Sequence, residues 1–218
     1  MSLGLLFTDE LRGFYRSKVM LFMWVGLPAI AVLMSVWYTS TAEMPLTVLT
    51  GLLVSTISGT LAAVMLVASI VSEREKRVYD LFLVRPVLRR EILVSKFMAV
   101  YVCVSIAVAI ALGLGLAIDF ATSDVPLSDI VGPLRSSLIT CFATLAVTSA
   151  AGVLIGVGAP SIIAGVVLVI YGANQIGGVI AVVGAMYLKS DPLTALLGAS
   201  LTVALMACAI VVFDRKQL

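Results

Sequence analysis

The side chains that could carry out chemistry are few and widely spaced. The 218-residue sequence contains no histidine, and its three cysteines, Cys103, Cys141 and Cys208, stand in apolar runs without the spacing of metal ligands. Histidine is the commonest metal ligand and the commonest general base. The acidic residues fall at the ends of the apolar runs, so no carboxylate pair lies inside one. We therefore expect neither a catalytic site nor a metal site, and we interpret the cysteines as small buried hydrophobic residues.

A few polar side chains do lie inside the apolar runs. Thr140, Thr144 and Thr148 recur every four residues, and Asn174 and Gln175 stand together in a later run. A second stripe of small residues at the same spacing comprises Gly51, Ser55, Gly59 and Ala63. Small residues four apart let membrane helices approach closely, and amides buried in lipid need protein or a cavity beside them. Helix packing and the wall of a substrate pathway both fit these residues.

The overall composition excludes a soluble protein. Charged residues make up 12% of the chain and hydrophobic residues 61%, and the mean hydropathy is +1.18. A soluble domain carries about 25% charged residues. The formal net charge of +2 is too small to indicate a nucleic-acid partner. The lipid bilayer is therefore the expected surroundings, and residues 1–218 are expected to form a single transmembrane domain.

The gaps between charges predict an all-α polytopic protein with six membrane-spanning helices. A span needs about 20 apolar residues to cross about 30 Å of hydrocarbon. Two charge-free gaps hold one span each, and two longer gaps hold two each, divided at 38–45 and at 158–161. The predicted spans are 19–39, 46–72, 97–118, 136–157, 162–187 and 193–213. The sequence leaves open whether 174–192 completes a span or re-enters the membrane.

The basic residues predict the orientation. With the amino terminus inside, 12 of the 14 Lys and Arg residues fall on the inner side. Positive residues favour the cytoplasmic side of a membrane. Both termini are therefore predicted to be cytoplasmic.

Residues 2–18 are predicted to form an amphipathic helix in the membrane interface. Its apolar face comprises Leu3, Phe7, Leu11 and Phe14, and its basic face includes Arg12 and Arg16. Such a helix lies flat, with its apolar face in the acyl boundary and its basic residues near anionic headgroups. It is either a topology anchor or an additional contact for a cytoplasmic partner.

Residues 73–96 form the longest predicted cytoplasmic loop. A charged start, Glu73 to Arg77, is predicted to continue the second span as a helix. Apolar and aromatic residues follow within 79–84, before Pro86 breaks the helix. Exposed apolar surface beside charge is typical of an interaction site, although it also fits packing against the protein's own bundle.

This loop resembles the permease subunits of type-2 ATP-binding cassette (ABC) exporters. The resemblance rests on the Glu-Arg-Glu-Lys run at 73–76, the Leu-rich middle, Pro86, the Arg-Arg-Glu-Ile-Leu run at 89–93 and Lys96. It implies that the loop docks on a separate ABC ATPase subunit. The residues to which it assigns this coupling role are Glu73, Arg74, Glu75, Tyr79, Asp80, Leu81 and Arg85.

The resemblance has further implications for partners and location. It implies a second permease copy or a homologue, so that a dimer exports a substrate across the plasma membrane of a prokaryotic cell. The chain has no GxxxxGK[ST] motif. ATP and Mg²⁺ are accordingly expected in the partner subunit, with no cofactor on this chain and no enzymatic activity of its own. A membrane scaffold without transport and a permease like the haem exporter are the alternatives.

Overall fold

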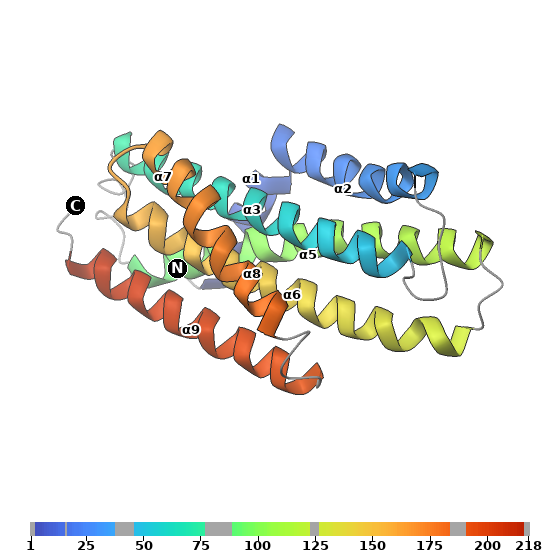
Figure 1. The fold of residues 1–218 in the computed structure, drawn as a ribbon. Coiled ribbons are helices and arrows are strands. Elements are labelled where there is room, and N and C mark those ends of the chain that lie inside the picture. The colour runs from blue at the N-terminus through green and yellow to red at the C-terminus, as the bar shows by residue number, and fades with distance from the viewer. Residues whose placement is uncertain are drawn as a thin grey trace.

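The computed structural model describes residues 3–15, 17–37, 46–76, 89–122, 127–183 and 191–215. Within these ranges the chain is helical and has no strand, which confirms the all-α prediction (Figure 1). The helices are α1 (Leu3–Tyr15), α2 (Lys18–Trp37), α3 (Leu46–Glu75), α5 (Arg89–Thr122), α6 (Leu127–Gly158), α7 (Ile162–Leu168), the π-helix η1 (Val169–Ala173), α8 (Asn174–Val183) and α9 (Asp191–Arg215).

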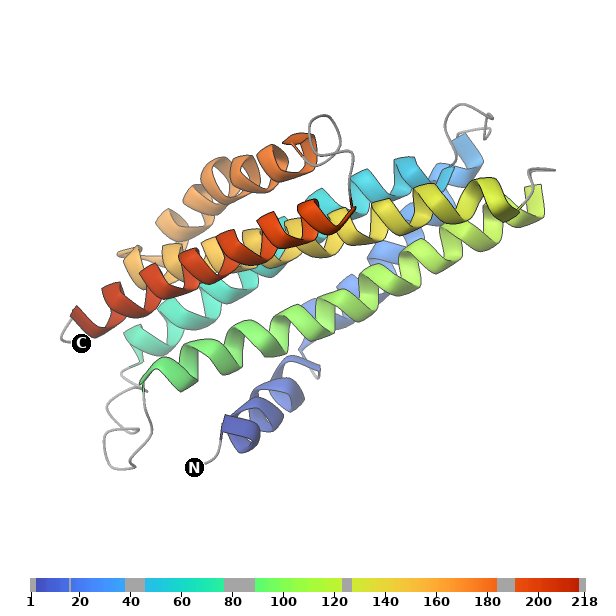
Figure 2. The same cartoon turned by 90° about the horizontal axis from the view of Figure 1, so that it is seen from below.

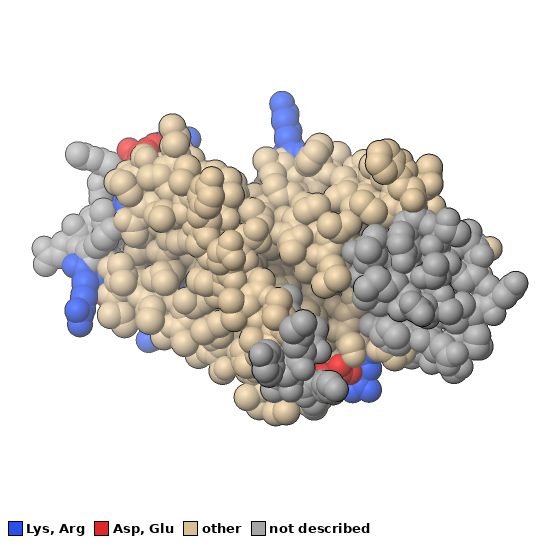
Figure 3. Space-filling view, in the orientation of Figure 1, with Lys and Arg blue, Asp and Glu red and all other residues tan. Residues whose placement is uncertain are grey.

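Six helices are long and apolar enough to cross a membrane, which confirms the predicted number of spans. They are α2, α3, α5, α6, α9 and the continuous helix made by α7, η1 and α8. At 1.5 Å per residue, the 34 residues of α5 extend about 51 Å, well beyond the hydrocarbon core. In Figure 3, the described residues on this face of the bundle are almost all uncharged, and the coloured Lys, Arg, Asp and Glu side chains lie toward the edges.

Helix α6 forms the centre of the bundle. It packs against α3, α5, α8 and α9, and its contact with α3 is the most extensive one between the described helices. Figure 2 shows α6 running beside α9 for the length of α9. The two predicted stripes of small residues meet at the α3–α6 contact. A Cβ atom built on Gly59 would lie 2.6 Å from Oγ1 of Thr148, and one built on Gly152 would lie 2.7 Å from Cα of Ala63.

The fifth span begins after the predicted break at 158–161. Ser161 caps α7, because its side-chain oxygen accepts a hydrogen bond of 3.3 Å from the backbone N–H of Ala164. The π-helix η1 then interrupts the span before α8 ends at Val183. A π-bulge adds one residue to a turn, so it shifts the face that the following residues present. The predicted remainder of this span, 184–187, lies outside the described residues.

Helical structure extends into the predicted loop 73–96 from both sides. Helix α3 continues to Glu75, in keeping with the charged helical start predicted for the loop, and α5 begins at Arg89, ahead of the span start predicted near Lys96. The prediction took the charge of Lys96 as the limit of the third span. The structure buries that charge beside two carboxylates, and α5 runs through this position.

The two ends of the chain lie toward the same end of the bundle. Figure 2 shows the labelled N and C ends, the last turn of α3 and the first turn of α5 at this end. Helix α1 packs mainly on α5 and makes only a small contact with α2. Ser17 separates α1 from α2, and its Oγ accepts a hydrogen bond of 3.1 Å from the backbone N–H of Met20.

Candidate functional site

The predicted coupling residues fall into two groups. Glu73, Arg74 and Glu75 form the last turn of α3. The other predicted coupling residues, Tyr79, Asp80, Leu81 and Arg85, lie outside the described residues. The described part of the site is therefore the last turn of α3 together with the elements packed around it.

Lys96 joins three helices at this point. Its side chain is 1% exposed, and its Nζ atom lies 2.7 Å from Oε1 of Glu10 on α1 and 2.5 Å from Oε1 of Glu73 on α3. Oγ of Ser69 lies 3.3 Å from the same ammonium nitrogen and donates to the Glu73 carboxylate at 3.3 Å. We call Glu10, Ser69, Glu73 and Lys96 the charged junction. Burying one ammonium alone would cost several kcal/mol, and two carboxylates and a hydroxyl offset that cost.

The charged junction also fixes the face that α1 turns toward the bundle. Nζ of Lys96 lies 6.0 Å from the centre of the Phe14 ring, in the range of a cation–π contact. Phe14 and Leu11 are half-buried against the main core, and Leu6 is buried. Part of the predicted lipid-facing side of α1 thus packs on protein.

The remaining predicted residues of α1 lie as follows. Phe7 is half-buried, and Arg12 is exposed. The side chain of Leu3 and all of Arg16 lie outside what the structure describes.

Arg74 ties the last turn of α3 to the opposite side of the bundle. Its Nη2 atom donates a hydrogen bond to the carbonyl oxygen of Ala159, in the turn between α6 and α7. Glu75 is exposed. The last turn of α3 is therefore held by α1 and α5 through Glu73 and by the α6–α7 turn through Arg74.

Glu73 was predicted as a site residue, but its ion pair with Lys96 and the second carboxylate on Lys96, that of Glu10, were not. Glu10 is 86 positions from Lys96, and Glu73 is 23 positions from it, so no helical spacing connects the three. A signal was nevertheless present. Asp9 and Glu10 are two acidic residues in an amphipathic segment whose charged face also holds Arg12 and Arg16, and an acidic residue at a basic membrane edge indicates a local partner.

The threonine stripe of α6 lies in a packed interface. Thr144 and Thr148 are each 4% exposed, and each hydroxyl donates to backbone carbonyls one turn earlier on α6. Thr140 is half-buried, and its carbonyl accepts the bond from Thr144. A Cβ atom on Gly177 of α8 would clash with Cγ2 of Thr148. These contacts support the packing interpretation of Thr144 and Thr148.

A second polar group lies on the surface between α3 and α8. Oγ1 of Thr60 donates to Oδ1 of Asn174 at 3.4 Å and to the carbonyl of Thr56 at 2.7 Å. Gln175 and Thr56 are exposed, and Tyr171 on η1 is 74% exposed. We call Thr56, Thr60, Asn174 and Gln175 the polar face. It lies within helices that are otherwise apolar, where an exposed amide is unfavourable in hydrocarbon.

Most of the chain matches a known protein family. Residues 15–195 match the family of ABC-2 family transporter proteins. This chain belongs to the ABC-2 transporter family. A search of curated proteins finds no match.

Family membership makes the chain the membrane-spanning permease of an ABC transporter and an integral membrane protein. Permeases of this family are typically non-enzymatic. Among the residues that the structure describes, no group of three or more His, Cys, Asp or Glu side chains could hold a metal ion.

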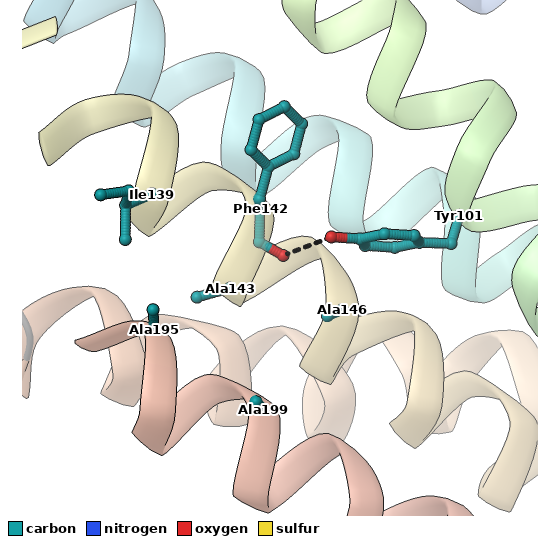
Figure 4. Close-up of a pocket in the computed structure, with 7 residues that line it drawn as sticks. All are labelled: Tyr101, Ile139, Phe142, Ala143, Ala146, Ala195 and Ala199. Carbon is teal, nitrogen blue, oxygen red and sulfur yellow. Dashed lines mark hydrogen bonds between the residues drawn. The ribbon is translucent and has the colours of Figure 1, made fainter. Parts of the chain in front are cut away.

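The ABC-2 permease also has an apolar groove between α5, α6 and α9. Its volume is about 240 Å³, and it is lined by Tyr101, Ile139, Phe142, Ala143, Ala146, Ala195 and Ala199 (Figure 4). The hydroxyl of Tyr101 donates to the carbonyl of Phe142 at 3.5 Å. The groove is open because the alanine side chains that line it are short. The groove can therefore contact apolar groups, and the hydroxyl of Tyr101 in its wall already donates a hydrogen bond to the backbone.

Proposed function

We propose that this ABC-2 permease exports a substrate across the plasma membrane of a prokaryotic cell, using ATP hydrolysed by a separate ABC ATPase subunit. The observation that carries the proposal is the charged junction. It places the last turn of α3, the start of α5 and helix α1 together at the end of the bundle where segment 77–88 connects α3 to α5.

The ATPase is a separate polypeptide in this proposal because the chain has no phosphate-binding GxxxxGK[ST] motif. Segment 77–88 carries the apolar and basic residues predicted to dock on it, among them Leu81 and Arg85. Both ends of the segment are anchored, by Glu73 and Arg74 on one side and by Lys96 on the other. Anchored ends suit a docking segment, because a displacement of the segment by the ATPase then moves the attached spans as well.

A second permease copy completes the transporter in this proposal and covers the polar face. Asn174 and Gln175 lie in a helix whose apolar neighbours suit lipid, yet Gln175 is exposed in a single chain. Two-fold association would place the same face of each copy opposite the other. Amides and hydroxyls there could bond across the interface or line a pathway for a polar part of the substrate.

The orientation follows from the basic residues. The end that carries α1, the last turn of α3 and the start of α5 is the cytoplasmic end, because 12 of the 14 Lys and Arg residues fall on that side of the predicted spans. The docking segment and both termini then face the compartment that holds ATP.

The docking of the ATPase is tested by purifying the permease from its source membranes and measuring the ABC ATPase bound per permease. Leu81→Asp places a carboxylate in the apolar part of segment 77–88, and Arg85→Glu reverses a charge there. We expect each change to lower the bound ATPase at least tenfold, because a desolvated apolar or ionic contact is lost.

Arg135→Glu is the matched control. Arg135 is 72% exposed and lies next to Asp191 near the predicted outer side. It should retain the ATPase at the wild-type level. Full retention of the ATPase in both Leu81→Asp and Arg85→Glu would contradict the docking assignment. Recovery of a partner without ATPase activity would favour a scaffold instead.

A further inference from the structure

The charged junction connects parts of the permease that the chain itself does not hold together. Glu10 belongs to α1, Ser69 and Glu73 to α3, and Lys96 to α5. Between α3 and α5 the chain runs through segment 77–88, and between α1 and α5 it runs through two further spans. Among the described residues, Lys96 is the cation of this contact, and its two ion pairs are with different helices.

The burial of Lys96 distinguishes this contact from an ion pair on the protein surface. The side chain is 1% exposed, whereas the two glutamates keep about a quarter of their exposure, 25% and 26%. A buried ammonium that loses one of its two carboxylates loses part of the compensation for its burial, and water does not replace it at a side chain that is 1% exposed. Relative movement of α1, α3 and α5 at this level is therefore disfavoured.

We propose that Lys96 is a positioning residue for transport: it locks α1, the last turn of α3 and the start of α5 into one unit that passes movement of the ATPase on to the spans. This inference rests on the proposed function and names the device by which docking is coupled to the bundle. Glu10 attaches the interfacial helix to the unit, and Glu73 attaches α3.

The contacts of Arg74 support this division of roles. Arg74 follows Glu73 in the chain but bonds to the carbonyl of Ala159 at the α6–α7 turn. Glu73 and Arg74, which are adjacent in one helical turn, thus bind two different parts of the bundle: α5 through Lys96, and the α6–α7 turn through Ala159. A displacement of this turn acts on α5 and α1 through Glu73 and Lys96, and on the turn before the fifth span through Arg74.

The first test measures the lock itself, by hydrogen exchange of the permease in lipid nanodiscs without the ATPase. Glu10→Gln removes one ion pair of Lys96 and leaves the pair with Glu73. We expect amide exchange across α1 to rise at least fivefold while exchange in α6 stays the same. Asp9→Asn is the control, since Asp9 is the exposed acidic neighbour on the same helix, and its exchange should match the wild type. Equal exchange in both variants and the wild type would overturn the proposal.

The second test measures coupling in the complex with the ATPase. The reporter is an environment-sensitive fluorophore on Leu52→Cys, in a background with Cys103, Cys141 and Cys208 replaced by alanine. Leu52 is 52% exposed and lies on α3, about 30 Å along the helix from Glu73. ATP with vanadate is expected to change its emission in the otherwise unaltered complex.

Lys96→Glu is expected to reduce this emission change at least fivefold while ATP turnover per complex stays within about twofold. Adding Glu10→Lys to Lys96→Glu restores one cation and two carboxylates at the junction, so at least half of the signal should return. An unchanged signal in Lys96→Glu would overturn the proposal. A parallel fall of signal, turnover and amount of complex without rescue by Glu10→Lys would also overturn it, since Lys96 would then be merely structural.

The two tests separate this proposal from the proposed function. A wild-type permease that binds no ABC ATPase contradicts the proposed function, whatever the exchange data show. If the wild-type complex binds and hydrolyses ATP but Glu10→Gln does not change the amide exchange of α1, only the proposed role of Lys96 is contradicted.

Discussion

Replacing Gly152 with alanine is expected to push α3 and α6 apart and to destabilise the whole permease. The new Cβ atom would lie 2.7 Å from Cα, 2.8 Å from Cβ and 2.9 Å from the carbonyl oxygen of Ala63. These contacts are with backbone and with the first side-chain carbon, so no rotamer change relieves them. Overpacking of this kind costs about 1–3 kcal/mol. The measurement is the melting temperature of the permease in lipid nanodiscs.

The matched control is Gly113→Ala on α5. Gly113 lies inside a helix, and nothing comes within 4 Å of a Cβ atom built there. Alanine favours a helix over glycine by about 1 kcal/mol, so the control should melt at the wild-type temperature or above it. A Gly152→Ala variant that melts with the control would show that α3 and α6 are not in backbone contact at this point.

The close α3–α6 contact illustrates how much of this fold is predictable from the sequence. The charge-free gaps predict the number of spans, because lipid tolerates few charges and one apolar helix needs a known length. The stripe of Gly51, Ser55, Gly59 and Ala63 and the stripe of Thr140, Thr144 and Thr148 predict that some pair of helices approaches closely. These stripes do not predict which helices pair, because the spans are mostly apolar around their circumference and lack the one-sided pattern of a soluble helix.

The limits of prediction are clearest at Lys96. A lone charge at the edge of an apolar run is ordinarily the end of a span, and the prediction followed that rule. The charge is tolerated inside the helix because Glu10 and Glu73 approach it from two other helices. Sequence periodicity relates residues on one helix, so contacts between helices distant in the chain remain outside its reach.

The candidate site was predictable to a similar extent. Glu73 and Arg74 were identified by resemblance, and the structure shows that both fasten the last turn of α3 to other parts of the bundle. Asn174 and Gln175 were predicted to face protein or a cavity. In the single chain Asn174 meets Thr60, while Gln175 remains exposed. The exposed amide is therefore the residue whose surroundings depend on a second copy in the proposed dimer.

Replacing Gln175 with leucine is expected to weaken the association of two permease copies by about tenfold to a hundredfold. A hydrogen bond between membrane helices contributes about 0.6 kcal/mol on average and up to about 1.7 kcal/mol. A two-fold interface contains each residue twice, so the loss is about 1–3 kcal/mol. Förster transfer between labelled copies, measured in liposomes over a series of protein-to-lipid ratios, gives the dissociation constant.

Ser200→Leu is the matched polar-to-leucine control on α9. Ser200 is exposed, and its hydroxyl donates to the carbonyl of Leu197 on its own helix at 2.9 Å. Its replacement by leucine should leave the dissociation constant unchanged, since the bond it removes lies within one helix. If the polar face met lipid instead of a second copy, Gln175→Leu would remove an unfavourable amide from hydrocarbon. It would then raise the melting temperature of the permease and leave association unchanged, and the polar face would be excluded as the interface.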